Sequence, residues 1–128
     1  MLELFDECRE NNGNFIEKPD KIARNKHYRI SINDIEFEWD TQKNEITVKK
    51  HGLSFEEAAE IFANEDTILV YDEEHSDLED RYNAIGFCKR SQLIVVCHCY
   101  RENDIIRIIS ARKADREEVQ LYYENQEV

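Results

Sequence analysis

The sequence predicts an α+β fold, in which two N-terminal helices and one C-terminal helix pack on an antiparallel sheet of about five to six strands. Three observations predict it. Two runs of alternating apolar and polar residues are separated by only two residues, two helix-start signals follow them, and a series of short β-branched runs precedes a final capped helix.

The first element is a hairpin over residues 28–39. Apolar side chains alternate with polar ones in HYRISI (27–32) and again in IEFEW (35–39). Only Asn33 and Asp34 lie between these runs, and both residue types tolerate positive φ, so a two-residue turn is predicted. In that register Tyr28 lies opposite Trp39, and Arg29 lies opposite Glu38 on the other face.

Two helices should follow the hairpin. Asp40 can cap a helix over about 41–51, whose last residues are basic and which is followed by Gly52, a typical helix stop. The segment Ser54-Phe55-Glu56-Glu57 is typical of a capping box and predicts a second helix over about 55–63.

Four strand candidates complete the sheet, at residues 67–71, 81–87, 93–100 and 106–112. The last two are nearly continuous β-branched runs, which is typical of central strands covered on both faces. The acidic segment beginning at Asp115 then opens a closing helix that ends near residue 124.

Composition limits the possible functions. The 128 residues fit one domain at 27–128, preceded by a polar, partly irregular extension at 1–26. The net charge of −12 argues against a DNA-coating role and suits a basic partner. No apolar run approaches the roughly 18 residues needed to span a bilayer, and the acidic start is unlike a secretion signal, so we expect a cytoplasmic protein without membrane contact. The four cysteines (Cys8, Cys88, Cys97 and Cys99) are then expected to be thiols.

Several strings occur together in the order of one known family. They are FEWD (37–40), KHG (50–52), SFEEA (54–58), HSDLEDRY (75–82), AIG (84–86), LIVVCHCY (93–100) and RIISARKA (107–114). Over residues 36–124 the chain resembles the BrnT toxins of bacterial type II toxin–antitoxin systems. The resemblance implies a RelE-like fold and a cytoplasmic endoribonuclease that inhibits translation and needs neither metal nor other cofactor. It also implies neutralisation by a BrnA-like ribbon-helix-helix antitoxin, with operator DNA bound only through that antitoxin.

A metal-free ribonuclease needs a base, an acid and cations at the scissile phosphate. We expect His51, Arg81, Ser110 and Arg112 to be the catalytic residues. Ideal alternation places Ser110 and Arg112 on one face of the last strand, whereas Arg107 joins them only if a bulge intervenes. The structural alternatives are that these arginines pair with carboxylates, and that His51 only stabilises the end of its helix.

Five further residues are candidates for substrate binding: Lys50, His75, Glu79, Arg107 and Tyr122. The alternatives are a solvated acidic loop around His75 and Glu79, and a core position for Tyr122. In Cys97-His98-Cys99, strand alternation points the histidine away from the two cysteines, so no metal site is expected. A second function class also remains open, in which the chain is a non-catalytic protein of the toxin fold that acts through antitoxin binding and operator autoregulation.

Overall fold

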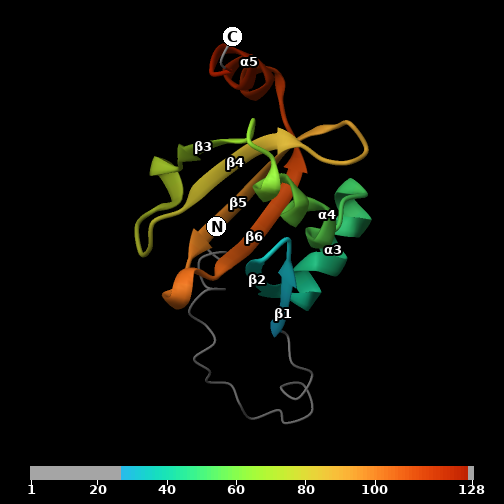
Figure 1. Ribbon diagram of the computed structural model, residues 1–128, viewed down its shortest axis with the longest axis vertical. Coiled ribbons are helices and arrows are strands. Elements are labelled where there is room, and N and C mark those ends of the chain that lie inside the picture. Colours follow the sequence, from blue (N-terminus) through green and yellow to red (C-terminus); the bar gives the residue numbers. More distant parts are fainter. Residues whose placement is uncertain (1–26, 127–128) are drawn as a thin grey trace.

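The computed structural model describes residues 27–126. A six-stranded sheet forms its centre, and three α-helices and three short 3-10 turns connect or flank the strands (Figure 1). The expectations for residues 1–26, including Cys8, lie outside the described residues. Within residues 27–126, every helix is too short or too polar to cross a membrane.

The predicted hairpin is confirmed. Strands β1 (His27–Ile32) and β2 (Ile35–Asp40) pair antiparallel, with Tyr28 opposite Trp39 and Arg29 opposite Glu38. Asn33 and Asp34 adopt φ values of 53° and 66°, as a two-residue hairpin turn requires. Trp39 is fully buried, because its ring lies between Tyr28, at 5.4 Å between centroids, and Phe55, at 5.8 Å.

The helix-start signals also act as predicted. Asp40 accepts hydrogen bonds from the backbone N–H groups of Gln42 and Lys43 at the start of α3 (Thr41–His51), which ends at Gly52 with φ 66°. Ser54 and Glu57 form the capping box of α4 (Phe55–Ala59), whose last turn continues as the 3-10 helix η2 (Glu60–Ala63).

The four later strands form a meander: β3 (Ile68–Tyr71), β4 (Tyr82–Phe87), β5 (Leu93–Tyr100) and β6 (Ile106–Lys113). Two 3-10 turns lie in its connections, η3 (Glu73–His75) and η4 (Glu102–Asp104), and α5 (Arg116–Glu124) follows β6. Asp115 and Glu118 form the capping box of α5.

The expectation of an antiparallel sheet is wrong at one pair of strands. The strand order is β1-β2-β6-β5-β4-β3, and β2 runs parallel to β6, with Glu38 beside Arg107. The chain crosses the sheet through α3 and α4 to its far edge and then returns inward by the meander. The sheet is therefore mixed, and alternation within a strand carries no information about the direction of such a distant partner.

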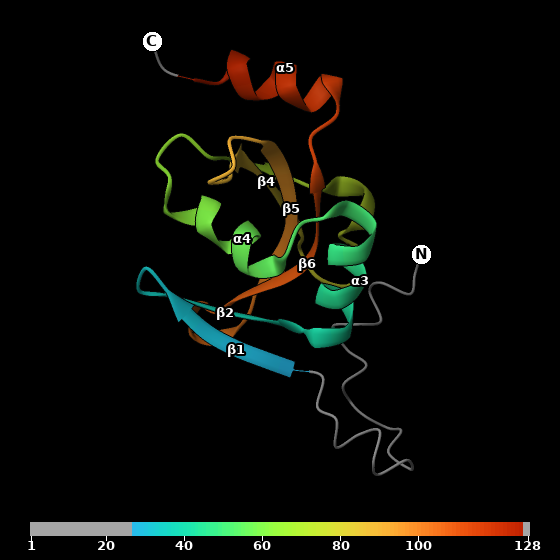
Figure 2. The same cartoon turned by 90° about the vertical axis from the view of Figure 1, so that its right-hand side faces the viewer.

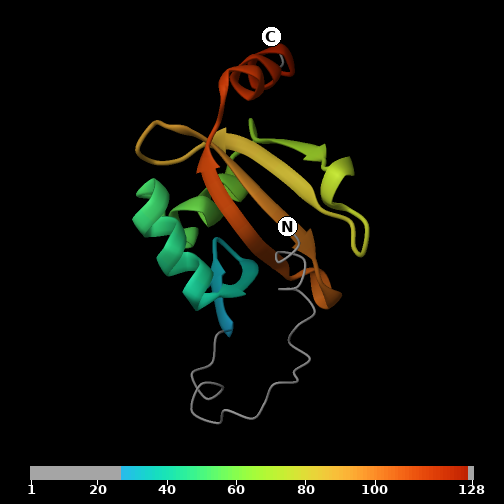
Figure 3. The same cartoon turned by 180° about the vertical axis from the view of Figure 1, so that it is seen from behind.

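The two faces of the sheet are covered differently. On one face, called here the α3/α4 face, the helical segment lies over the strands (Figure 2). Its side chains, among them Leu53, Phe55, Ala58 and Ile61, form one core cluster with Phe37, Val96 and Ile108. On the opposite face, Tyr122 of α5 packs with Ile85 and Val95 near one end of the sheet. Figure 3 views the molecule from this opposite face, with α5 beyond the strand ends.

A β-bulge changes the register between β5 and β6. Cys97 lies opposite Ser110 and His98 lies opposite Ile108, so Ile109 is the extra residue. Because Arg107, Ser110 and Arg112 lie opposite Cys99, Cys97 and Val95, all three point to the opposite face. The bulge thus meets the condition under which Arg107 shares a face with Arg112.

Candidate active site

A hollow of about 370 Å³ lies on the opposite face of the sheet, between the β3–β4 connection and the start of α5. Its lining is mainly polar and comes from four segments of the chain: Asp72, Glu74 and His75; Arg81 and Asn83; Val95 and Cys97; and Ile109, Ser110, Arg112 and Glu118. Four of these lining residues were predicted as site residues: His75, Arg81, Ser110 and Arg112. They bring an imidazole, two guanidinium groups and a hydroxyl together from three of the four segments.

Arg81 is the most deeply buried charged group of the hollow. Only 2% of the residue is exposed, and its Nη2 lies 3.4 Å from an Oε2 of Glu79. Its Nε has no hydrogen-bond partner among residues 27–126. A buried N–H without an acceptor costs free energy, so a hydrogen-bond acceptor that reached this donor would be stabilising. Glu79 itself does not line the hollow, but it contacts Arg81, which does.

His75 supplies the imidazole of the hollow. Its Nδ1 lies 2.9 Å from Oδ2 of Asp72, three residues earlier in the chain. Ser76 holds the connection in place, because its hydroxyl donates to the Asp72 carbonyl and accepts from the Arg81 backbone N–H. When Asp72 accepts the Nδ1 proton, the lone pair of Nε2 is the basic site of the ring.

Arg112 is anchored by the first turn of α5. Its Nη1 and Nη2 each donate to one carboxylate oxygen of Glu118 at 2.8 Å, and 44% of its side chain remains exposed. The hydrogen bonds from Arg112 lower the pKa of Glu118, and the same bonds raise the pKa of Arg112. Both groups therefore stay charged. The pairing agrees with the alternative interpretation of Arg112, in which it forms an ion pair with a carboxylate.

The structure does not bring every predicted residue into the hollow. Lys50 and His51 are exposed in the last turn of α3, and neither lines it. The imidazole that shares the hollow with Arg112 is therefore that of His75. His51, which we expected in a site with Arg112, does not line this hollow. Tyr122 is buried, with its ring edge-on to Phe87 at 5.6 Å, which supports the core alternative.

Arg107 lies on the face of the hollow but has a different environment. It is 2% exposed, and its Nη1 donates to Oε2 of Glu38 at 3.1 Å. Arg29 and Arg101 contact the same carboxylate at 3.1 and 3.5 Å. Burial opposes ionisation of Glu38, but these arginines, above all Arg107, lower its pKa overall. This arrangement supports the alternative interpretation of Arg107, in which it pairs with a carboxylate instead of binding substrate.

One group of possible metal ligands occurs in the described part of the chain. Asp72, Glu74 and His75 place one ligand atom each within 4.8 Å of one another, and Asp72 is already engaged by His75. In Cys97-His98-Cys99 the register directs His98 to the α3/α4 face and Cys97 to the hollow, as alternation predicts. These three residues therefore cannot bind one ion together.

His98 predicts a specific pH dependence of stability. It is fully buried, and burial lowers its pKa to about 4, although a hydrogen bond with the Val96 carbonyl acts in the opposite direction. Because the unfolded chain binds this proton near pH 6.5, stability is lost as the pH falls from there towards 4. Between pH 7.5 and 5 this residue should reduce the free energy of unfolding by about 2 kcal/mol.

Urea denaturation at both pH values measures this loss, and His98→Gln is the control because it keeps a hydrogen-bond donor without titrating. The wild-type chain should lose more stability than His98→Gln over this interval. Equal losses in the two proteins would contradict the buried, neutral state of His98.

Asp72 and Glu118 contact the predicted residues of the hollow but were not themselves predicted as site residues. Asp72 belongs to a dense acidic segment, and only its spacing of three residues from His75 could have singled it out. Glu118 lies in the first turn of the predicted closing helix and bonds to the backbone N–H of the N-cap residue Asp115. Arg112 lies six residues earlier and reaches Glu118 across the turn between β6 and α5.

The comparisons with known proteins agree with the motifs. A family model described as "Ribonuclease toxin, BrnT, of type II toxin-antitoxin system" matches residues 39–118, a range that contains every residue lining the hollow. No curated protein sequence matches the chain. The match covers more than half of the chain, and the family is one whose members work with an antitoxin partner. The chain belongs to the BrnT family of ribonuclease toxins.

Proposed function

We propose that this chain is a metal-independent endoribonuclease and that the hollow on the opposite face of the sheet is its active site. The observation that carries the proposal is the buried Arg81, whose Nε has no partner among residues 27–126 and whose side chain lines the same hollow as Arg112 and His75. Two guanidinium groups beside an imidazole provide both the charge and the proton transfer that RNA cleavage requires.

The two arginines bind the scissile phosphate. A guanidinium group donates two hydrogen bonds in one plane, which fits two phosphate oxygens. Arg81 is held in place by its burial, whereas the half-exposed Arg112 can exchange one carboxylate oxygen of Glu118 for a phosphate oxygen. Ser110 lies opposite Cys97 and lines the same hollow, where its hydroxyl donates a further hydrogen bond to the phosphate.

His75, in place of His51, is the general base. Asp72 orients the ring, and Nε2 removes the proton from the ribose 2′-hydroxyl. The 2′-oxygen then attacks phosphorus and the bond to the 5′-oxygen breaks. The imidazolium returns the proton to that leaving oxygen, so the products are a 2′,3′-cyclic phosphate and a 5′-hydroxyl.

The proposal also covers the effect of the toxin on translation and its antitoxin partner. Cleavage of RNA in the cytoplasm would inhibit translation, in keeping with a RelE-like toxin. A BrnA-like ribbon-helix-helix antitoxin would neutralise it and bind operator DNA for the pair. Family membership supports the antitoxin partner, and the net charge of −12 suits a basic one.

One observation favours a second candidate, a non-catalytic protein that acts only through antitoxin binding and autoregulation. Arg112 is paired with Glu118 at both ends of its fork, and three carboxylates line the hollow. In this alternative the pair is purely structural, and purified RNA is not cleaved.

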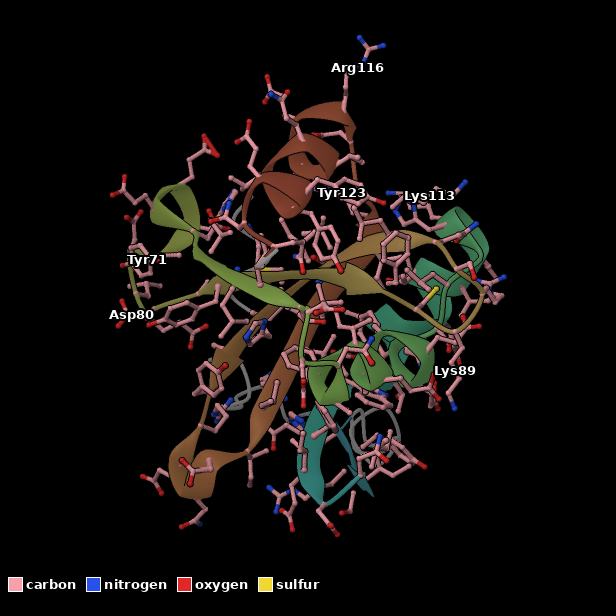
Figure 4. All side chains as sticks on the ribbon, turned by 45° about the horizontal axis from the view of Figure 1, so that its top comes forward. Tyr71, Asp80, Lys89, Lys113, Arg116 and Tyr123 are labelled. Atoms are coloured by element: carbon pink, nitrogen blue, oxygen red, sulfur yellow. The ribbon has the colours of Figure 1, made fainter. Side chains whose placement is uncertain are left out.

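Cleavage of a labelled RNA by the isolated chain in EDTA separates the two candidates. Arg112→Ala should lower the cleavage rate by roughly 10²–10³, because it removes a fixed charge at the phosphate. Arg116→Ala is the matched control, since Arg116 projects away from the body of the protein at the start of α5 (Figure 4). Circular dichroism verifies the fold of both variants. No cleavage by the unchanged chain, or equal rates for the two variants, would contradict the proposal.

A further inference from the structure

Tyrosine side chains form an exposed surface on the α3/α4 face, beyond the part that the helices cover. Tyr71, Tyr82 and Tyr100 come from three adjacent strands, and their rings follow one another at 5.5 and 5.7 Å between centroids. Leu69 lies on the same face of β3, two residues before Tyr71. We call Leu69, Tyr71, Tyr82 and Tyr100 the tyrosine surface.

The helical cover ends at the border of this surface. Phe62 of η2 packs edge-on against His98 at 4.8 Å, and the next ring along β5 is that of Tyr100, at 5.2 Å from His98. Beyond that point the side chains are open: Leu69 is 53% exposed, Tyr71 is 45% exposed and Tyr100 is 47% exposed. Large apolar groups gathered in this way on a small protein mark an interaction surface.

The charge beside the tyrosine surface is negative. The Tyr71 hydroxyl donates to Asp80 at 2.9 Å, and the two side chains lie together at the edge of the molecule (Figure 4). The connection that follows Tyr71, residues 72–80, contains six carboxylates, of which Asp72 and Glu74 line the hollow on the opposite face and Asp80 contacts Tyr71. Tyrosine faces attract ammonium and guanidinium groups, and the nearby carboxylates add to that attraction.

We propose that the antitoxin docks on the tyrosine surface through a segment that combines apolar side chains with lysine or arginine. Tyrosines are frequent energetic centres of protein interfaces, and the acidic connection selects a basic partner. Nucleobases also stack on tyrosines of a sheet, but the carboxylates beside this surface would repel the phosphates that come with them. An antitoxin partner is implied by family membership, so the inference does not depend on catalysis.

The test measures binding of the protein encoded by the adjacent reading frame to the full chain by calorimetry. Tyr71→Ser/Tyr100→Ser should raise Kd by about 30-fold or more. Tyr71→Phe/Tyr100→Phe keeps the rings and should bind within about threefold of the unchanged chain. Tyr123→Ser is the control for loss of an exposed tyrosine elsewhere, since Tyr123 lies on α5 (Figure 4). Thermal melting verifies that each variant is folded.

Three results would overturn the inference. In the first, the unchanged chain fails to bind that protein. In the second, the double serine variant binds it as tightly as the unchanged chain does. In the third result, the double serine variant still binds that protein but no longer binds a labelled single-stranded RNA that the unchanged chain binds. The last result would identify an RNA platform. RNA cleavage in EDTA is measured on the same samples. If the unchanged chain binds the partner but does not cleave, the proposed function fails while the docking surface stands.

Discussion

Replacing Arg81 with methionine should reduce RNA cleavage by at least roughly 10²-fold while leaving the protein as stable as before. Arg81 is buried, yet its only ionic contact in the described residues is the 3.4 Å approach to Glu79. Exchanging such a poorly compensated buried charge for an apolar side chain of similar length is neutral or stabilising, here by up to about 1 kcal/mol. Cleavage assays in EDTA and urea denaturation of the same samples measure the two quantities.

Arg107→Met is the matched control for stability. Both arginines are 2% exposed, but Arg107 pairs with Glu38 at 3.1 Å, so its loss should lower the free energy of unfolding. A large loss of stability in Arg81→Met would mean that Arg81 is a structural residue like Arg107. Full cleavage activity in a stable Arg81→Met variant would remove it from the active site.

The largest expected effect on stability comes from Glu38→Ala. This carboxylate lies at the centre of three arginines, and its removal leaves the buried Arg107 without its counter-charge. Breaking a buried pair in this way typically costs about 3–5 kcal/mol. Because the folded-state pKa of Glu38 is lowered, its contribution is present above the unfolded-state pKa and is lost as the pH falls through the folded-state value.

Glu36→Ala is the control for that experiment. Glu36 lies two residues earlier on the same face of β2 but is exposed, so its loss should change stability by no more than about 0.5 kcal/mol. Urea denaturation at pH 7 compares the two variants with the unchanged chain. Similar stabilities for Glu38→Ala and Glu36→Ala would show that the arginine cluster contributes little.

Local chemistry accounts for the parts of the fold that the sequence predicts well. The hairpin register follows from Asn33-Asp34 and the alternation on each side of it, because a two-residue turn leaves no freedom of pairing. The helix starts at Asp40, Ser54 and Asp115 follow from side chains that bond to nearby backbone N–H groups.

Contacts between distant segments account for the rest. The parallel pairing of β2 with β6 depends on where the meander places its last strand, which no local pattern encodes. The bulge at Ile109 brings Arg107 to the face of Arg112, but only the position of Glu38 explains why Arg107 stays out of the hollow. For the same reason, His51 and His75 are equivalent candidates by residue type, and only the folded connection from Asp72 to Arg81 places His75 beside the guanidinium groups.

The most direct test of catalysis in the hollow is the identity of the RNA termini after incubation with the purified chain in EDTA. Mass spectrometry should find a 2′,3′-cyclic phosphate on one product and a 5′-hydroxyl on the other. A substrate with deoxyribose at the cleaved nucleotide should remain intact there, and Arg81→Met should form these products at least roughly 10²-fold more slowly. No cleavage without a divalent ion, or products with a 3′-hydroxyl and a 5′-phosphate, would contradict attack by the 2′-oxygen in this hollow.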